Sequence, residues 1–273
     1  MKSILSPVFI LGALGVATHL SAATIPYFEN FDDQALGTAA PLDNQNNAWN
    51  ESSGYSIVEA PSAFSGRSYN LNQTAPSGSL GLHSTFNVGS SLNGGDFILT
   101  TDFIINSATL PTSAATSRIG FGALSNNAGL SGGTWYLADF VVATFGVGSA
   151  ATGTLRINEI GGNESGDRTS TASAIAINLG DVYRMSLEGT YSDGALVFDY
   201  TVENLSNPSS ISMSTTYNTP LTGTHFGYRN SVGSGGSMDA TLDNFSIIPE
   251  PGAYAVLFGM AGLSLAVLRR PRR

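Results

Sequence analysis

The acidic residues are the first side chains that could carry chemistry, because cleavage of a glycosidic bond uses two carboxyl groups that face one another. Glu159 and Glu164 lie five residues apart, with Gly161 and Gly162 between them. Successive side chains of a strand point to opposite faces, so this separation places the two glutamates on opposite sides of a regular strand. We interpret the pair as part of a solvated hairpin loop and assign no catalytic residue.

The candidate nucleophiles and the histidines do not indicate catalysis either. Residues 129–133 read Gly-Leu-Ser-Gly-Gly and match the G-x-S-x-G pattern, which needs a strand before it and a helix after it. The residues that follow continue as a strand, so a glycine-rich loop is the better interpretation. The chain has no cysteine, and His83 and His225 are the only histidines after residue 23. This composition excludes thiol catalysis and a histidine-rich metal cluster.

Aromatic side chains could instead bind sugars, since a flat ring buries well against the apolar face of a pyranose. Trp49 lies in the polar stretch 44–53 and is the candidate we expect to be exposed. Trp135 lies in an apolar run and is expected in the core. Further aromatic candidates are Tyr55, Tyr69 and Tyr228.

Short strands must position these side chains, because the chain shows no convincing amphipathic helix. Apolar and polar residues alternate most clearly in 182–191 and 195–204. Ser192-Asp193-Gly194 between them supplies a tight turn, with a glycine available for a positive φ. We predict a hairpin with one buried and one solvated face.

The remaining strands predict an all-β domain. Residues 134–145 are apolar at both parities, which predicts a central strand covered on both faces. Other predicted strands are 80–88, 96–105, 118–124, 154–160 and 224–229. About a dozen strands, separated by Gly, Asn, Ser and Asp turns, favour a two-sheet sandwich.

The last predicted strand changes phase at Asp243 and Asn244. Its apolar residues before that point share one parity and those after it have the other (Met238, Ala240 and Leu242 against Phe245 and Ile247). A strand of period two buries both sets only with a one-residue bulge. We predict the bulge at Asp243-Asn244, where it re-aims the Asp243 carboxylate.

The two ends of the domain carry a resemblance. Phe28-Glu29-Asn30-Phe31-Asp32 near the start and 242–247 (Leu-Asp-Asn-Phe-Ser-Ile) at the end resemble the first and last strands of concanavalin A-like (LamG-like) jelly rolls. The resemblance implies that these two strands lie side by side. Some carbohydrate-binding jelly rolls hold a structural calcium ion there, and Glu29 and Asp243 are the matching positions for Ca²⁺. No other cofactor is expected.

The charge balance limits the partners. Residues 24–248 hold 19 of the 20 acidic residues, six arginines and no lysine, so this domain has a net charge near −13. Such a surface repels phosphate backbones, which argues against nucleic acid as a partner, and it tolerates neutral polysaccharides. The six arginines are Arg67, Arg118, Arg156, Arg168, Arg184 and Arg229.

The N-terminus has the order of a secretory signal peptide. Lys2 precedes the apolar run 4–20, and the small residues Ser21-Ala22-Ala23 follow. This order of charged, apolar and small residues suits export and cleavage by signal peptidase. We predict that residues 1–23 are the signal peptide and that the cut follows Ala23.

The C-terminus predicts a second targeting signal. Residues 253–268 are free of charge, and a basic cluster follows at once, which predicts a transmembrane helix with its basic end in the cytoplasm. The triplet Pro249-Glu250-Pro251 stands before it, and the cluster consists of Arg269, Arg270, Arg272 and Arg273. Residues 249–273 thus resemble a PEP-CTERM sorting tail. The resemblance implies recognition by an exosortase-type enzyme and a location in the bacterial cell envelope or, after cleavage, at the cell surface.

Together these features predict three parts, namely residues 1–23, a jelly-roll sandwich over residues 24–248, and the tail 249–273. We expect an exported, non-enzymatic protein that is associated with extracellular matrix or polysaccharide. A secreted glycoside hydrolase or lyase of the same fold is the alternative. A structural surface protein without a ligand is a third possibility.

Overall fold

A computed structural model of the chain describes residues 27–38, 50–51, 54–75, 80–87, 95–109, 117–127, 133–144, 151–169, 174–233 and 235–249. Strands β1 to β16 are the regular elements of these ranges, and no helix occurs among them. A helix long and apolar enough to span a membrane is accordingly not found in the described ranges.

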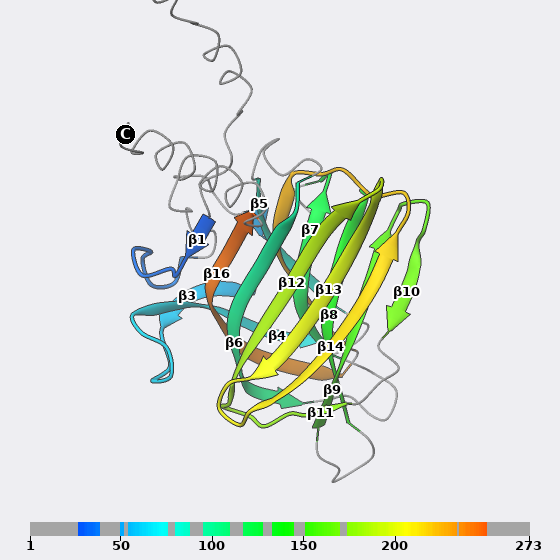
Figure 1. The fold of residues 1–273 in the computed structure, drawn as a ribbon. Coiled ribbons are helices and arrows are strands. Elements are labelled where there is room, and N and C mark those ends of the chain that lie inside the picture. The colour runs from blue at the N-terminus through cyan, green and yellow to red at the C-terminus, as the bar shows by residue number, and fades with distance from the viewer. Residues whose placement is uncertain are drawn as a thin grey trace, which may run out of the picture.

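The strands form two sheets of eight, which Figure 1 shows as two layers with β12–β14 in front of β7–β9. The first sheet contains β1 (Tyr27–Glu29), β3 (Tyr55–Glu59), β4 (Arg67–Ala75), β6 (Phe97–Thr109), β12 (Val182–Ser192), β13 (Ala195–Asn204), β14 (Ser209–Tyr217) and β16 (Gly236–Pro249). The second contains β2 (Asn50–Glu51), β5 (Leu80–Asn87), β7 (Ser117–Ser125), β8 (Trp135–Thr144), β9 (Ala151–Ile160), β10 (Gly166–Thr169), β11 (Ile175–Ala176) and β15 (His225–Val232).

The strand order is that of an antiparallel sandwich. The first sheet runs β14-β13-β12-β6-β16-β4-β3, with β1 paired to β16 beside this path. The second runs β10-β9-β8-β7-β15-β5-β2, with β11 paired to β9. Neighbouring strands are antiparallel in both sheets. The prediction of an all-β, two-sheet jelly-roll sandwich is confirmed.

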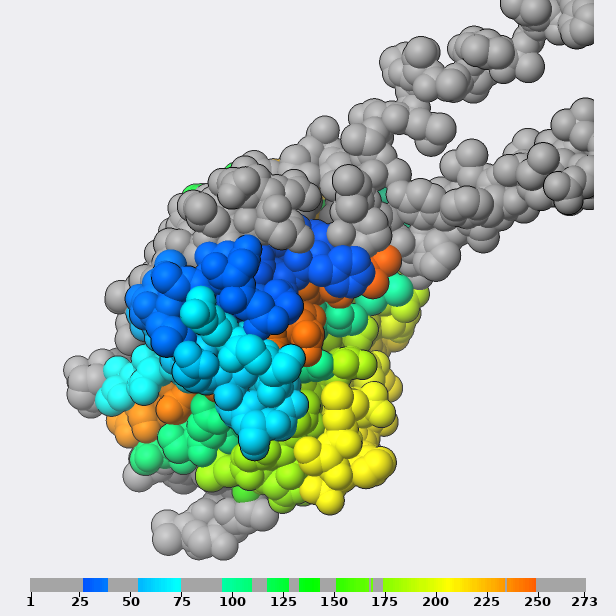
Figure 2. Space-filling view, turned by 90° about the vertical axis from the view of Figure 1, so that its left-hand side faces the viewer, coloured from blue at the N-terminus to red at the C-terminus, as the bar shows by residue number. Residues whose placement is uncertain are grey.

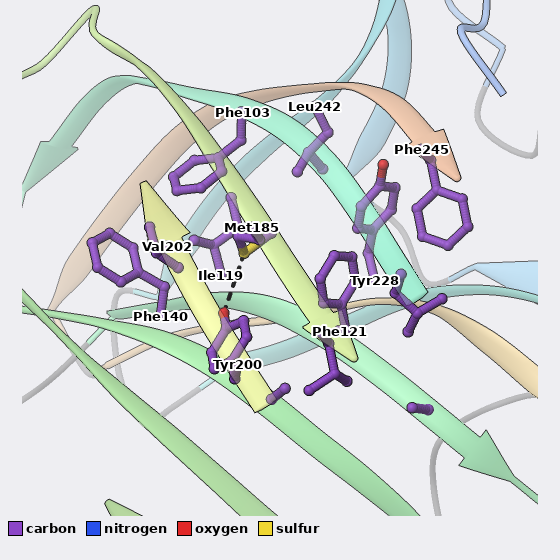
Figure 3. Packing of buried hydrophobic residues seen from close by; sticks show 14 of the residues in the cluster. Phe103, Ile119, Phe121, Phe140, Met185, Tyr200, Val202, Tyr228, Leu242 and Phe245 are labelled. Atoms are coloured by element: carbon purple, nitrogen blue, oxygen red, sulfur yellow. Dashed lines mark hydrogen bonds between the residues drawn. The ribbon is translucent and has the colours of Figure 1, made fainter. Parts of the chain in front are cut away.

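Aromatic rings from both sheets fill the space between them (Figure 3). Phe103 of the first sheet and Phe140 of the second have ring centroids 5.9 Å apart, and Tyr228 meets Phe245 edge-on at 5.2 Å. The hydroxyl of Tyr200 donates to the sulfur of Met185 at 3.4 Å. Each large apolar side chain buried in this way contributes roughly 1.5–3 kcal/mol to folding.

The predicted hairpin is confirmed as β12 and β13. Ser192 pairs with Ala195 across the turn, and Asp193 and Gly194 have φ values of 51° and 83°. Two residues with positive φ make a turn of type I′, whose twist matches that of the paired strands.

The central position of 134–145 is confirmed by β8, which pairs with β7 and β9. Tyr136 and Phe140 point into the main core, while Trp135 and Leu137 are buried on the opposite face beside Ile160. Both parities of this strand are therefore covered, as their apolar character predicts.

The terminal strands lie side by side, as the concanavalin A-like resemblance implies. Tyr27 pairs with Ile247 and Glu29 with Phe245, so β1 joins the first sheet beside the end of β16 (Figure 1). The ring of Tyr27 meets the ring of Phe245 edge-on at 6.1 Å.

The bulge in the last strand is also confirmed. Asp243 pairs with Asp102 of β6, whereas Ser246 pairs with Thr100. Between these two pairs β16 therefore contains one residue more than β6. Asn244 takes the left-handed conformation, with a φ of 52°. The apolar residues on both sides of the bulge are consequently buried in one core.

Most residues of the two predicted targeting signals lie outside the described ranges. These are residues 1–23 with Ala23, together with Glu250, Pro251, Arg269, Arg270, Arg272 and Arg273. Pro249 is the last residue of β16 and pairs with Phe97, so the first proline of the Pro249-Glu250-Pro251 triplet belongs to the sandwich.

Candidate functional site

A hollow of about 520 Å³ opens where β1, β6, β12 and β16 meet. In Figure 2 the segment around β1 (blue) lies directly beside the surface of β16 (orange). Residues that line the hollow are Phe28, Glu29, Asn30, Asp33, Thr100, Arg184, Asn244, Phe245, Ser246 and Ile248. It therefore combines apolar, amide, hydroxyl and charged groups.

Arg184 lines the hollow and is held in place by an ion pair with Asp102. The guanidinium of Arg184 donates to both carboxylate oxygens of Asp102, at 2.7 and 3.0 Å. The side-chain amide of Asn244 donates to the same carboxylate at 3.1 Å. The hydrogen bond from Arg184 to Asp102 raises the pKa of Arg184, so this guanidinium keeps its charge. The bulge has a direct role here, because the left-handed backbone of Asn244 brings its amide to Asp102.

Phe28 provides an apolar surface at the same place. Alternation along β1 buries Tyr27 and Glu29 and turns Phe28 outward, where its side chain is 56% exposed. It pairs with Ser246 of β16 across the edge of the first sheet. Phe28 was not predicted as a site residue, although its opposite parity to Tyr27 indicates that it faces outward.

A row of hydroxyl groups crosses the outer face of the first sheet from this point. Register places Ser246 beside Thr100, and their hydroxyl oxygens are 2.6 Å apart. The row continues through Ser186, Thr201 and Ser212 on the next three strands. Because neighbouring strands lie about 4.8 Å apart, this hydroxyl row (Ser246, Thr100, Ser186, Thr201, Ser212) is about 19 Å long.

Glu29 uses its carboxylate within the fold. One oxygen accepts the backbone N–H of Phe31 at 2.8 Å, and the other accepts the hydroxyl of Tyr27 at 3.5 Å. Phe31 has a φ of 60°, so the first of these bonds holds the chain in a conformation that a phenylalanine rarely adopts. Glu29 thereby fixes the turn that leaves β1.

Asp243 is buried beside the bulge. Its carboxylate accepts the backbone N–H of Asn244 at 2.8 Å and the hydroxyl of Ser68 at 3.4 Å. Burial raises the pKa of Asp243 to about 7, against the lowering effect of these bonds, and the charges of Asp32 and Asp102 raise it further.

Glu29 and Asp243 do not make a calcium site by themselves. The ion takes six to eight oxygen ligands, whereas these carboxylates have different hydrogen-bond partners inside the protein. Within the described ranges, no group of three or more His, Cys, Asp or Glu is placed to hold a metal. Calcium binding at this pair stays a prediction.

The other predicted aromatic candidates are core residues. Tyr55, Tyr69, Tyr228 and Trp135 are each 5% exposed or less, so none of these rings can stack on a sugar at the surface. The expectation that Trp135 lies in the core is confirmed. The suggestion that the three tyrosines could bind a sugar is wrong, because they too are core residues. Trp49 lies outside the described residues.

The interpretation of Glu159 as a solvated loop residue is wrong. Its side chain is fully buried, and one oxygen accepts the backbone N–H of Glu164 at 2.8 Å. Glu164 instead accepts the backbone N–H of Thr219 at 2.7 Å and forms an ion pair with Arg168. The two glutamates stabilise the β9–β10 turn and the loop that contains Thr219. They do not face one another across a cleft.

Known proteins offer a likeness of fold. No protein-family model matches this chain, and no curated protein sequence matches it. Similar solved structures include peanut lectin with a 9mer peptide, at 14% identity over 83% of this chain and 100% of that chain, with a TM-score of 0.45. Lectin UEA-II complexed with galactose has 11% identity over 82% and 97%, with a TM-score of 0.48. The marine PL7 alginate lyase from Zobellia galactanivorans has 11% identity over 84% and 96%, with a TM-score of 0.39.

Proposed function

We propose that this chain is a non-enzymatic carbohydrate-binding protein of the bacterial cell envelope. The hollow beside Phe28 takes one sugar unit, and the hydroxyl row receives the units that follow. Residues 1–23 direct export, and residues 249–273 direct sorting by an exosortase-type enzyme.

The carrying observation is the exposed ring of Phe28 beside a hollow lined with polar groups. A sugar has an apolar ring face and a rim of hydroxyls, so it needs one flat apolar partner together with hydrogen-bonding groups. Arg184 and Asn244 offer donors, and Ser246 and Thr100 offer hydroxyls that both donate and accept.

Two carboxylates near the hollow, those of Asp102 and Glu29, are engaged within the fold, which favours binding over catalysis. Asp102 accepts three hydrogen bonds from Arg184 and Asn244, and Glu29 holds the backbone of Phe31. A general acid or base must instead be placed to exchange a proton with the substrate. The two acids therefore have structural roles that explain their positions.

A binding experiment tests this proposal. The purified protein is tested on a glycan array and then by affinity electrophoresis in the glycans that bind. Phe28→Ala is expected to weaken binding about tenfold, because it removes the stacking surface and leaves the polar groups unchanged.

Leu179→Ala is the matched control. Leu179 is 57% exposed, so this change removes a similarly exposed apolar side chain elsewhere on the protein. Equal glycan affinities of Phe28→Ala and Leu179→Ala would mean that the sugar binds elsewhere on the protein. An array without any bound glycan would favour the structural role without a ligand.

A further inference from the structure

The hollow beside Phe28 has an exposed carboxylate in its lining as well as an aromatic ring. Asp33 lines it together with Phe28, and both belong to the segment that begins with β1. Asp33 is exposed and accepts a hydrogen bond from the side-chain amide of Gln34 at 2.7 Å. It forms no ion pair with any residue of the described ranges. Its negative charge is therefore available to a ligand.

The backbone around Asp33 is held in a fixed turn. The N–H of Gln34 donates to the carbonyl of Phe31 at 3.1 Å, which closes a β-turn with Asp33 inside it. Arg67 of β4 holds the same turn from the other side. Its backbone N–H donates to the carboxylate of Asp32 at 2.8 Å, and its guanidinium donates to the carbonyl of Gln34. A residue held in this way needs little ordering when a ligand binds.

The other charges near the hollow leave that of Asp33 in excess. Arg184 lines the hollow, but its guanidinium donates to both carboxylate oxygens of Asp102, so these two charges balance. Arg67 brings a second guanidinium to the turn, and Asp32 brings a second carboxylate beside it. Both arginines close to the hollow in the described part of the chain thus have an acid of their own.

The rest of the domain adds to this negative potential. Residues 24–248 hold 19 acidic residues against six arginines and no lysine. Next to the hollow, burial raises the pKa of Asp243, and the charges of Asp32 and Asp102 raise it further. These acids therefore already disfavour another negative charge at this corner of the sandwich. An anionic ligand would meet the same repulsion, whereas a cationic ligand is attracted.

Phe28 favours a cation at the same place. A positive charge is attracted to the face of an aromatic ring when it lies within about 6 Å of the ring centre. The side chain of Phe28 is 56% exposed and lines the hollow together with Asp33. A small cationic group in the hollow can therefore contact the ring and the carboxylate at once.

We propose that the hollow recognises a sugar with a protonated amine, so that the ligand is a polymer of glucosamine-type units with free amino groups. This inference rests on the proposed function and names the class of sugar. The ammonium group contacts the carboxylate of Asp33 and the ring of Phe28. The hydroxyls of the same unit bond to the amide of Asn244 and to the hydroxyls of Ser246 and Thr100. An acidic sugar is a poorer ligand because Asp33 repels it.

The first experiment compares two ligands that share one backbone. Chitosan tetramer has a free amine on each unit, whereas in chitin tetramer every amine is acetylated and neutral. Calorimetry on the purified protein at about pH 6, where amines are protonated, is expected to show about tenfold tighter binding of chitosan tetramer at low salt. The preference should shrink as salt rises. Equal affinities for the two tetramers would overturn the proposal.

Variants then assign the preference to Asp33. Asp33→Asn removes the charge and keeps an acceptor for the amide of Gln34. It should reduce the preference for chitosan tetramer to about threefold or less and leave the affinity for chitin tetramer unchanged. Asp193→Asn is the matched control, because Asp193 is an exposed acid of the β12–β13 turn that does not line the hollow. Thermal melts check that each variant is folded. An undiminished preference in Asp33→Asn would contradict the proposal.

The outcomes separate this inference from the proposed function. Equal binding of the two tetramers, lost for both in Phe28→Ala, would overturn the amino-sugar assignment and keep carbohydrate binding at the hollow. Unchanged binding of both tetramers in Phe28→Ala would overturn the two proposals together. Competition by putrescine, a diamine without a sugar ring, at the same molar affinity as chitosan tetramer would show a simple cation site and overturn the sugar assignment.

Discussion

Asp243 of β16 pairs with Asp102 of β6, so two acidic residues are direct cross-strand neighbours in the first sheet. Asp102 is held by Arg184 and Asn244, and its neighbour Asp243 by one backbone N–H and the hydroxyl of Ser68. Burial, with the charges of Asp32 and Asp102, raises the pKa of Asp243 to about 7. The bulge that supplies the amide of Asn244 to the hollow therefore also buries a carboxyl group that resists ionisation.

The first prediction concerns the pH dependence of stability. Below the ordinary pKa of 3.8, Asp243 is protonated in both the folded and the unfolded chain and has no effect. Between 3.8 and about 7 only the unfolded chain releases its proton, so stability falls as pH rises, and above 7 the full penalty remains. Asp243→Asn should remove this penalty and stabilise the protein at pH 8 by roughly 1–3 kcal/mol.

Urea unfolding in EDTA at pH 4 and pH 8 measures this effect. The asparagine keeps an acceptor for the N–H of Asn244, so the hydrogen bonds at the bulge survive. The stabilisation should shrink towards zero at pH 4. An equal gain at both pH values would mean that the ionisation of Asp243 is not its cause.

A second prediction concerns the left-handed backbone of Asn244. A β-branched residue at a φ of 52° is strained, whereas glycine is not. Asn244→Val and Asn244→Gly both lose the hydrogen bond to Asp102, so their comparison isolates the backbone. Asn244→Val should be less stable than Asn244→Gly by about 1–2 kcal/mol in urea unfolding. Equal stability would mean that β16 loses its bulge in the valine variant.

Local sequence patterns predicted those features of the fold that depend on one strand or on two consecutive strands. The bulge follows from the phase change between Leu242 and Phe245, and the hairpin from alternation around Asp193-Gly194. Strand β14 was missed, because its serines and threonines hide the alternation of Ile211, Met213 and Tyr217. Strands β3 and β4 were missed as well, since they are short or rich in asparagine.

The candidate site was less predictable, because its residues come together only through sheet order. Arg184 and Asp102 are 82 positions apart, and nothing local indicates that β12 lies beside β6. For Glu159 the local sequence was misleading. A glutamate beside two glycines suggests a solvated turn, but its side chain is buried.

A third prediction concerns calcium. An ion that binds only the folded chain stabilises it by mass action, so millimolar Ca²⁺ should raise the thermal midpoint above that in EDTA. Asp243→Ala should lose the rise if Asp243 is a ligand. Identical midpoints in EDTA and in calcium would end the hypothesis for Glu29 and Asp243.

A fourth prediction concerns sorting. If residues 249–273 act as a PEP-CTERM signal, Glu250→Ala should stop C-terminal processing in the native host. Glu203→Ala is the matched control, because Glu203 is an exposed acid of β13 within the sandwich. Mass spectrometry of the mature protein measures the C-terminus of each variant. Normal cleavage of Glu250→Ala would show that the triplet is not read by a sorting enzyme.

The last prediction separates binding from catalysis. A general acid works best with a pKa near the operating pH, which makes Asp243 the strongest candidate acid near the hollow if the protein is a hydrolase. Its side chain is only 2% exposed and does not line the hollow, so a bound sugar cannot reach it without rearrangement of the bulge. We therefore expect no release of reducing sugar and no lyase product from plant, algal or bacterial polysaccharides, with Asp243→Asn indistinguishable from the unchanged protein. Sustained turnover that disappears in Asp243→Asn, with the fold intact, would establish the hydrolase or lyase and displace the binding proposal.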